Sequence, residues 1–420
     1  MIDLKKLRQD PKRYEQKTKS QWLNIDFDEL IKLDEQIRNM KSQIDELSSH
    51  RNSISKEIAE LQKEWKDPQE HKEKVKEIKT ELDQKQKDYD ELYQKFYDIY
   101  IQIPNPPLDD VIYWESDDDN AVIYYSWDKP KFDFEPLPHY ELLEQRDMLD
   151  QKRSAKVAGT RFYYIKDWLV KLELALINYA IDVLIKKWFR PVMWPNLVRY
   201  DTMLGAGFFP AEKNEVYKVN PGEDDLYLIW TSEAILVGQH MNETIDLEEL
   251  PLRYAWFSPC YRREAGSYGK DTKWMIRVHQ FEKVEMVSFT STKDSYKEHE
   301  FLTEIEEEIV QNLWIHYQKI DICTWDVWFH AAKKYDLEAW FPGLDSYKEI
   351  TSCSNCTDFQ ARRAKIKYKD GQEKDFLHTL NWTAIAVGRV MACIVENNQT
   401  KDMKIKIPKV LQNYMNAEEI

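Results

Sequence analysis

The sequence predicts an α+β protein, in which an antiparallel β-sheet flanked by helices follows an N-terminal antiparallel helical hairpin. Two observations support this fold class. Apolar residues recur at alternating spacings of three and four over residues 30–61 and 75–99, the pattern of a coiled coil. Beyond residue 108 these heptads stop, and short β-rich segments follow one another with few β–α–β alternations.

The hairpin prediction depends on two apolar seams with a helix-breaking stretch between them. Lys66-Asp67-Pro68 separates the seams, and only Arg51 interrupts the first. Each helix would reach roughly 45–50 Å at 1.5 Å per residue. The pattern fits a dimerisation coiled coil, and it also fits an intramolecular arm that reaches for a large partner. The seam residues are Leu30, Leu33, Ile37, Met40, Ile44, Leu47, Ile54, Ile58 and Leu61, then Val75, Ile78, Leu82, Tyr89, Leu92, Phe96 and Ile99.

The body of the protein begins after a proline-rich stretch at residues 104–107, so we predict domains of 1–108 and 109–420. Expected strands are 162–165, 191–193, 226–229, 254–261, 277–287, 335–340 and 347–353, and expected helices are 169–187, 298–317 and 383–397. The sequence contains no glycine-rich phosphate loop followed by Lys-Ser/Thr. A nucleotide would therefore be bound by side chains on a sheet.

Composition restricts the cell compartment more than the function. The net charge of −15 argues mildly against nucleic-acid binding, although a local basic face can bind RNA on an acidic protein. The charged first 20 residues are no signal peptide, and the longest apolar stretch, 174–185, is too short to span a membrane. Five cysteines fit a reduced cytosolic protein. Cys353 and Cys356 have no second pair to complete a zinc site, so structural thiols are the preferred interpretation.

Two groups of residues have the chemistry of a nucleotide site. Arg262, Glu264, Arg277 and Phe281 fall on two neighbouring predicted strands. They offer guanidinium groups for phosphate oxygens, a carboxylate for a polar edge and a ring for stacking a base, which suits ATP. Later in the chain, residues 349–352 supply a carboxylate and a hydroxyl, hard oxygen ligands for Mg²⁺. Taken singly, such residues are usually surface ion pairs or core side chains, so their order along the chain carries the argument.

That order resembles a known family over nearly the whole chain. The motifs are Pro138-His139, Gly159-Thr160-Arg161-Phe162, Asp225 to Ile229, Ser258 to Gly266, Arg277 to Phe281, Ser352 to Asn355, Phe359 to Arg363 and His378 to Asn381. Together with the helical arm, they resemble the seryl-tRNA synthetases of the class II aminoacyl-tRNA synthetase group. The resemblance implies a class II catalytic domain at 109–420 and a tRNA-binding domain at 1–108. Pro195 resembles the proline of the family's dimer-interface motif, and the third motif ends at Arg389.

The resemblance implies a nucleotide site with ATP as substrate and Mg²⁺ as cofactor. Arg262 would grip the α-phosphate and the serine carboxylate, Glu264 would orient the adenosine, and Phe281 and Arg389 would stack on the adenine from opposite faces. Glu349 and Ser352 would hold the metal. The implied catalytic residues are Arg262, Glu264, Arg277 and Arg389, and the implied ATP-binding residues are Arg262, Arg263, Glu264, Val278, Phe281, Glu349, Ile350, Thr351, Ser352 and Arg389.

The family also implies a serine pocket and macromolecular partners. The serine-binding residues would be Thr231, Ser232, Glu233, Arg262, Glu285, Asn381 and Thr383. The resemblance further implies a cytoplasmic homodimer that binds serine tRNA through its helical arm and uses neither a membrane nor DNA. Whether it also charges selenocysteine tRNA is left open by the sequence. Two alternatives are open. One is a homologue that loads a carrier protein, although such homologues lack the arm. The other is a catalytically decayed coiled-coil RNA-binding scaffold.

Tryptophan stands at many positions where the family has glycine. The chain holds 15 tryptophans and only 10 glycines, and glycine at 10 of 420 residues is about 2.4%, against roughly 7% in typical proteins. We hypothesise that a codon translated here as tryptophan, with UGA the candidate, is glycine in the source organism. The alternative is a divergent enzyme that has absorbed large residues at these positions. Trp382 would otherwise crowd the serine pocket. The affected positions are Trp188, Trp274, Trp325, Trp328 and Trp382, with Trp168, Trp230, Trp256 and Trp314 similar, whereas the family carries tryptophan at Trp340.

Overall fold

The computed structural model describes residues 1–114, 116, 119–265 and 275–420. The chain divides into two compact units. One comprises Asp3–Ile103, and the other combines Met1–Ile2 with Pro104–Ile420. Our boundary after residue 108 stays a prediction. Within the described residues, no helix is both long and apolar enough to cross a membrane.

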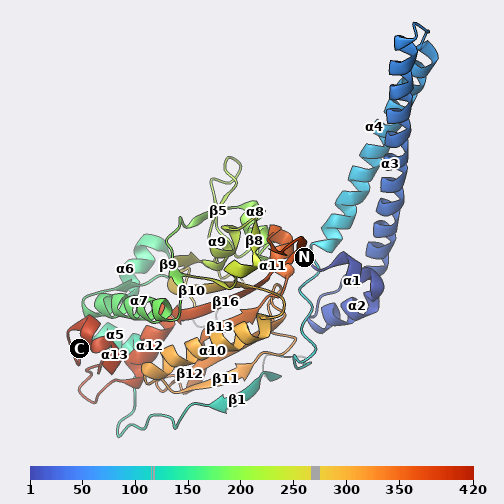
Figure 1. Ribbon diagram of the computed structural model, residues 1–420. Coiled ribbons are helices and arrows are strands. Elements are labelled where there is room, and N and C mark those ends of the chain that lie inside the picture. Colours follow the sequence, from blue (N-terminus) through green and yellow to red (C-terminus); the bar gives the residue numbers. More distant parts are fainter. Residues whose placement is uncertain (115, 117–118, 266–274) are drawn as a thin grey trace. The chain divides into compact units, whose positions relative to one another are not determined.

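The unit of residues 3–103 is helical, and its two long helices form the predicted hairpin (Figure 1). Lys85 Nζ donates to Gln43 Oε1 at 2.8 Å, and His71 Nε2 lies 3.5 Å from Glu57 Oε2. These two contacts pair later residues of one helix with earlier residues of the other, which requires antiparallel packing. The helices are α1 (Leu4–Gln9), α2 (Pro11–Ser20), α3 (Phe27–Lys63) and α4 (Gln69–Tyr100).

Local sequence explains where these helices begin. The side chains of Asp3, Asp10 and Asp26 each accept backbone N–H groups from the first turn of α1, α2 and α3. Pro11 occupies the first position of α2, where its missing N–H leaves no donor unpaired. In the first turn of α3, Leu30 is fully buried, as the apolar seam requires.

The body is built on an eight-stranded sheet, which confirms the α+β fold class (Figure 1). Every neighbouring pair of strands is antiparallel except β4 and β9, which are parallel. In spatial order the strands are β1 (Ala121–Tyr125), β11 (Tyr317–Asp321), β12 (Lys333–Phe341), β13 (Ser346–Asn355), β16 (His378–Ala386), β10 (Gln280–Thr290), β9 (Leu252–Tyr261) and β4 (Arg190–Pro191).

Smaller sheets and helices complete the body. The sheets are β5 (Leu197–Arg199), β7 (Leu226–Leu228) and β6 (Lys218–Val219), then β15 (Glu373–Phe376), β14 (Lys367–Asp370) and β8 (Thr244–Asp246), and the pair β2 (Leu149–Asp150) and β3 (Tyr164–Ile165). The helices are α5 (His139–Gln145), α6 (Gln151–Ala158), α7 (Trp168–Lys186), α8 (Tyr200–Gly205), α9 (Glu233–Gly238), α10 (Ser295–Asn312), α11 (Phe359–Ala364), α12 (Val387–Asn397), α13 (Lys409–Met415) and the 3₁₀ turn η2 (Leu247–Glu249).

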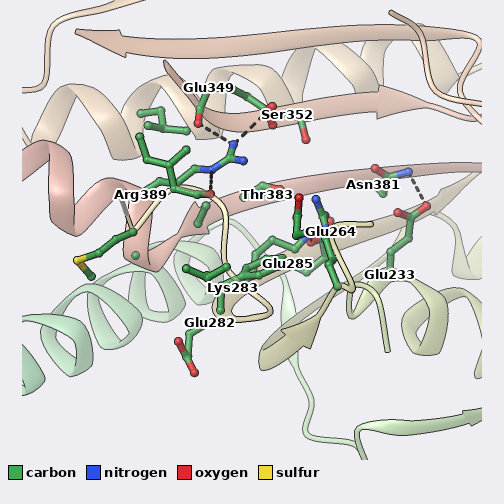
Figure 2. Close-up of a pocket in the computed structure, with 18 of the residues that line it drawn as sticks. Glu233, Glu264, Glu282, Lys283, Glu285, Glu349, Ser352, Asn381, Thr383 and Arg389 are labelled. Carbon is green, nitrogen blue, oxygen red and sulfur yellow. Dashed lines mark hydrogen bonds and ion pairs between the residues drawn. The ribbon is translucent and has the colours of Figure 1, made fainter. Parts of the chain in front are cut away.

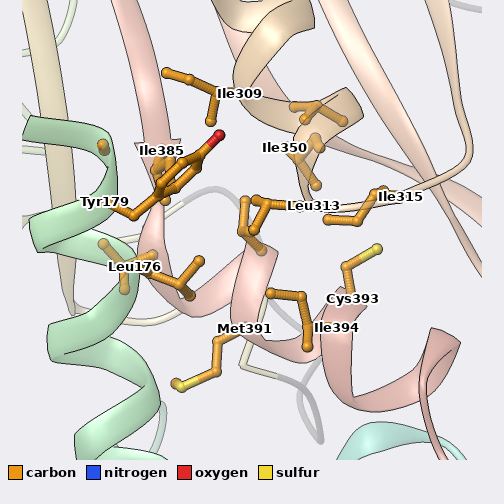
Figure 3. Packing of buried hydrophobic residues seen from close by; sticks show 14 of the residues in the cluster. Leu176, Tyr179, Ile309, Leu313, Ile315, Ile350, Ile385, Met391, Cys393 and Ile394 are labelled. Atoms are coloured by element: carbon orange, nitrogen blue, oxygen red, sulfur yellow. The ribbon is translucent and has the colours of Figure 1, made fainter. Parts of the chain in front are cut away.

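The main core lies between the large sheet and helices α7, α10 and α12 (Figure 3). Leu176 of α7, Leu313 at the C-cap of α10 and Ile394 of α12 meet there. The sheet contributes every second side chain of a strand to this core, because successive side chains point to opposite faces. On β10, Val284 and Met286 enter this core. The residue between them, Glu285, therefore faces the other side of the sheet, where the candidate site lies.

Two predicted helices were too long. The helix predicted over 298–317 ends at Asn312, and Tyr317 already begins β11. The helix predicted over 383–397 begins only at Val387, so the prediction was wrong for Thr383. Strand β16 passes into α12 without a polar or glycine-rich break, and a short apolar run does not distinguish strand from helix by pattern alone.

Candidate active site

A pocket on the face of the sheet opposite the main core collects most of the predicted site residues (Figure 2). Strands β10, β13 and β16 form its floor, and the first turn of α12 contributes Arg389. The pocket holds about 750 Å³ of empty space, including the part open to solvent. The predicted residues that line it are Glu233, Arg262, Glu264, Val278, Phe281, Glu285, Glu349, Ile350, Ser352, Asn381, Thr383 and Arg389.

A β-bulge on β13 brings the two predicted metal ligands to one face. Glu349 and Ser352 are three residues apart, so a regular strand would point them to opposite faces. Strand β12 pairs Leu337 with Thr351 but Glu338 with Glu349, which leaves Ile350 as the extra, bulged residue. Glu349 and Ser352 consequently both line the pocket (Figure 2).

Glu349 and Arg389 form a cation–carboxylate pair at one end of the pocket. Arg389 Nη1 lies 3.5 Å from Glu349 Oε2 and donates to the Glu349 backbone carbonyl at 2.8 Å. Burial alone would raise the pKa of Glu349, but the positive charges of Arg389, Lys334 and Arg262 outweigh it and lower the pKa below its usual value. The carboxylate is therefore ionised near neutral pH and suited to a hard cation.

Arg262 is a buried cation between aromatic rings. Its guanidinium carbon lies 3.8 Å from the ring centroid of Trp230 and 5.0 Å from that of Phe281. Burial, and then the charge of Arg389, lower its pKa below the usual value for arginine. Arginine remains protonated under such shifts, so the pocket holds two guanidinium groups that an anionic ligand would neutralise.

Glu264 connects the end of β9 to the segment before β10. Its Oε2 lies 3.7 Å from Arg277 Nη1, and its backbone adopts a φ of +50°, an unusual conformation for a glutamate. Arg161 donates to its carbonyl at 3.5 Å. These contacts hold the Glu264 side chain at the pocket wall while Arg277 remains about half exposed.

The other end of the pocket is acidic and rich in hydrogen bonds (Figure 2). Glu233 Oε1 accepts from Asn381 Nδ2 at 2.7 Å and from Gln360 Nε2 at 2.6 Å. On β10, Glu285 forms an ion pair with Lys283 and accepts from Thr231 Oγ1 at 3.2 Å. Two buried carboxylates so close together are suited to an ammonium group.

Burial controls the protonation of this acidic end. It raises the pKa of Glu285 to about 7, with Lys283 acting in the opposite direction and Glu233 adding to the rise. A carboxyl with that pKa is half ionised at neutral pH and gains from an added positive charge.

Five predicted residues are absent from the pocket lining that the structure describes. Thr231 is behind the wall, bonded to Glu285, and buried Ser232 accepts from Ser258 Oγ at 3.1 Å. Arg263 donates to the Asn214 carbonyl at 3.2 Å. Thr351 is buried in β13, and Arg277 Nη1 lies 3.7 Å from Oε2 of the pocket residue Glu264.

Comparison with known proteins connects this geometry to a family. Residues 1–107 match the model of the seryl-tRNA synthetase N-terminal domain, and residues 217–398 match the tRNA synthetase class II core domain (G, H, P, S and T). A serine–tRNA ligase of Kosmotoga olearia is 41% identical over the full length of both chains. The chain belongs to the seryl-tRNA synthetase family. The resemblance drawn from the sequence is thereby confirmed.

Solved structures of seryl-tRNA synthetases share the fold. The enzyme from Pyrococcus horikoshii, complexed with ATP, is 37% identical with a TM-score of 0.91 and covers 100% of this chain and 99% of its own. The cytoplasmic serine–tRNA ligase of Naegleria fowleri, in complex with AMP, is 31% identical with a TM-score of 0.86, covering 98% and 96%.

In this seryl-tRNA synthetase the sequence prediction missed several pocket residues. Lys283 is the most important of them, because its ion pair with Glu285 must open before another cation can approach that carboxylate. Strand alternation could have identified it, since Phe281, Lys283 and Glu285 share one face of β10. Glu282 and Trp328 also line the pocket.

One prediction about tryptophan was wrong. Trp382 does not crowd the serine pocket, because it lies between Asn381 and Thr383 on β16 and its side chain points into the main core on the opposite face. Among the described tryptophans, Trp328 is the one that lines the pocket. Trp274, and residues 266–274 of the second class II motif, lie outside the described residues.

The cysteines do not form a paired metal site. Cys353 Sγ lies 3.2 Å from Thr303 Oγ1 in the main core, whereas Cys356 Sγ accepts from Asn381 Nδ2 near the pocket, at 3.2 Å. A different set could hold a metal ion, since Glu233, His330 and Cys356 place ligand atoms within 4.8 Å of one another. This cluster joins residues from three distant segments, so no sequence spacing indicated it.

Proposed function

We propose that the protein activates serine with ATP and transfers the seryl group to serine tRNA. The observation that carries this proposal is the division of one pocket into two chemically distinct ends. One end suits a nucleoside triphosphate and its metal ion, because it holds Arg262, Arg389, Glu349 and Ser352. Glu233 and Glu285 suit an ammonium group, so an amino acid and ATP would meet between the two ends.

The first step joins the amino acid to AMP. A serine carboxylate oxygen attacks the α-phosphorus, a new P–O bond forms, and the bond to the β-phosphate breaks, with the electron pair leaving on pyrophosphate. The carboxylate is already the nucleophile, so no general base is required. Arg262 would stabilise the charge that grows on the α-phosphate, because a fixed cation in a buried site interacts strongly with it. In the second step a ribose hydroxyl of the tRNA terminus attacks the acyl carbon and AMP leaves.

Serine recognition would combine charge with hydrogen bonding. Glu233 and Glu285 would hold the ammonium group, with Thr231 orienting Glu285. Asn381 and Thr383 line the pocket beside Glu233, where a side-chain hydroxyl can be bonded. A site built to bond that hydroxyl discriminates strongly against alanine, because alanine leaves the polar groups unpaired.

Glu349 and Ser352 fit a magnesium ion. Both present oxygen atoms to the pocket, and Glu349 is held ionised by the surrounding cations. Magnesium prefers one or two protein oxygens together with phosphate and water. Bound there, it would neutralise phosphate charge, while Arg389 positions Glu349 through its two contacts.

The partners follow from the family. The hairpin of α3 and α4 would bind serine tRNA, and charging of selenocysteine tRNA is part of the same proposal. We also propose a cytoplasmic homodimer. The decayed-scaffold alternative receives no support from the comparisons, and the retained N-terminal domain counts against a carrier-protein ligase.

The test is serine charging of tRNA by the full chain and by two matched variants. Glu349→Gln should reduce charging by at least tenfold. Glu338→Gln is the control, because Glu338 is paired with Glu349 across β12 and β13 but is bonded to Gln318 at 2.6 Å outside the pocket. Equal charging by both variants would remove Glu349 from the site, and no charging by the unmodified chain would refute the proposed function.

A further inference from the structure

Four tryptophans adopt a backbone conformation that favours glycine. Trp22, Trp65, Trp188 and Trp314 have φ angles of +59°, +58°, +67° and +58°. The structure describes 14 of the 15 tryptophans, Trp274 being the exception. Only a few per cent of non-glycine residues have positive φ, and bulky residues are exceptional among them. Fewer than one such tryptophan is expected, so four require an explanation.

All four occupy the same position in the same helix-ending motif. Each stands one residue beyond the C-cap of a helix, after α2, α3, α7 and α10 respectively. In a Schellman motif that position is left-handed and usually glycine, its N–H bonds three residues back, and the next N–H bonds five residues back. Trp188 donates to Ile185 at 3.1 Å, and Phe189 donates to Leu184 at 3.0 Å.

The other three ends repeat these bonds. The five-residue bonds run from Leu23 to Thr18 at 3.3 Å, from Lys66 to Leu61 at 2.9 Å and from Ile315 to Val310 at 3.4 Å, and the three-residue bonds run from Trp22 to Lys19, Trp65 to Gln62 and Trp314 to Gln311. The hydrogen bonds thus fix the backbone of all four tryptophans in the left-handed region. Glycine is the residue that adopts this region without a steric penalty, because it has no Cβ.

The four indole rings are largely exposed, so burial does not offset this cost. Trp65 is 96% exposed, Trp188 84%, Trp314 73% and Trp22 55%. An exposed ring gains little from burial, although tryptophan normally contributes through buried area. The described glycines include four with positive φ, so tryptophan occupies such positions as often as glycine does in this chain.

A second set of tryptophans is anomalous in a different way. The indole Nε1 atoms of Trp230, Trp256 and Trp382 are buried and have no hydrogen-bond acceptor among the described residues. A buried tryptophan usually pairs this N–H. Trp340 provides the contrast, because its ring packs 5.0 Å from the Tyr347 ring and carries the Lys129 ammonium at 3.2 Å. Trp340 therefore behaves as an ordinary tryptophan.

We infer that the protein made in its own organism carries glycine at positions 22, 65, 188 and 314, so that one codon translated here as tryptophan is decoded there as glycine. Trp22 and Trp65 were not among the suspect positions drawn from family resemblance, so backbone geometry identifies them independently. The buried residues Trp230, Trp256 and Trp382 are assigned to the same codon. Trp340 is assigned to the ordinary tryptophan codon.

This assignment changes the active site. The Trp230 ring lies against the Arg262 guanidinium and 5.2 Å from the ring of Trp328, which lines the pocket. Glycine at 230 would remove the ring that lies against the cation proposed to grip the α-phosphate and the serine carboxylate. This consequence rests on the proposed function, whereas the four helix ends do not.

The test is peptide sequencing by mass spectrometry of the protein purified from the organism that encodes it. Glycine at 22, 65, 188 and 314, with tryptophan at 340 in the same digest, is the expected result. Tryptophan at the four positions would overturn the inference. The gene supplies an independent check, since UGA is expected at the four positions and UGG at 340, and UGG at all five would also overturn it. Neither readout depends on enzymatic activity.

Discussion

Lowering the pH from 8 to 6 should weaken serine binding through the carboxyl group of Glu285. The group is buried, and its pKa is raised to about 7. Its ionised form attracts an ammonium group, and its protonated form does not. Because the folded pKa lies above the ordinary value of 4.5, the carboxyl takes up a proton as the pH falls through about 7. Affinity for serine is therefore present above that pH and is lost below it.

The size of the effect follows from the ionised fraction. With a pKa of about 7, roughly one-tenth of Glu285 is ionised at pH 6 and roughly nine-tenths at pH 8. The KM for serine should thus rise about tenfold over this range, which corresponds to about 1.4 kcal/mol. The ion pair with Lys283 and the bond from Thr231 are included in the shifted pKa.

The assay is serine-dependent ATP–pyrophosphate exchange, with KM measured for serine and for ATP across this pH range. Glu285→Gln is the control, because it cannot titrate and should give a higher but pH-independent KM for serine. The KM for ATP should change little in either protein, since Glu285 lies at the other end of the pocket. A serine KM that is the same at pH 6 and pH 8 in the unmodified protein would refute this reasoning.

Three further predictions concern stability, the metal and specificity. Trp188→Gly and Trp314→Gly should each be about 1 kcal/mol more stable than the matched alanine variants, because alanine retains the steric cost of the left-handed backbone conformation. Urea unfolding measures this difference, and equal unfolding midpoints for the glycine and alanine variants would contradict it. Ser352→Ala should raise the Mg²⁺ concentration for half-maximal exchange by about threefold to tenfold, and an unchanged Mg²⁺ requirement would remove Ser352 from the metal site. Asn381→Ala should reduce the preference for serine over alanine by about tenfold or more in exchange assays, and an unaltered ratio would show that Asn381 does not sense the hydroxyl.

Periodicity predicted the parts of the fold that repeat. The heptads of residues 30–61 and 75–99 lie within α3 and α4, because the apolar seam buries residues of both helices, Leu30, Ile44 and Leu82 among them. Alternation on β10 separates Val284 and Met286, in the core, from Phe281 and Glu285, in the pocket. A regular strand thus indicates which residues share a face, and the family resemblance indicated which face holds the site.

Irregular backbone was not predictable from spacing. The bulge at Ile350 allows Glu349 and Ser352 to share a face, and neither of these two residue types predicts a bulge. The same limit explains the helix prediction that failed at Thr383, where β16 continues to Ala386 before α12 begins. The wrong expectation for Trp382 has a different cause, because regular strand alternation on β16 turns this residue away from the face of Asn381 and Thr383.

Contacts between distant segments likewise could not be predicted from the sequence. His330 lies 3.3 Å from Glu233, and Gln360 donates to the same carboxylate from α11. Lys334 lowers the pKa of Glu349 from a neighbouring strand. Each of these residues would be an ordinary polar side chain in a pattern analysis, and only the folded chain shows that they adjoin the site.

The decisive measurement is serine-dependent ATP–pyrophosphate exchange by the full chain, with alanine, threonine and cysteine as controls. We expect exchange with serine and at least tenfold less exchange with each control amino acid. A second version of the chain, with glycine at the suspect tryptophan positions, should exchange at least as fast. Glycine removes the backbone strain at the helix ends and opens the space beside Arg262. Absence of exchange in both versions, or equal exchange with alanine, would contradict the account.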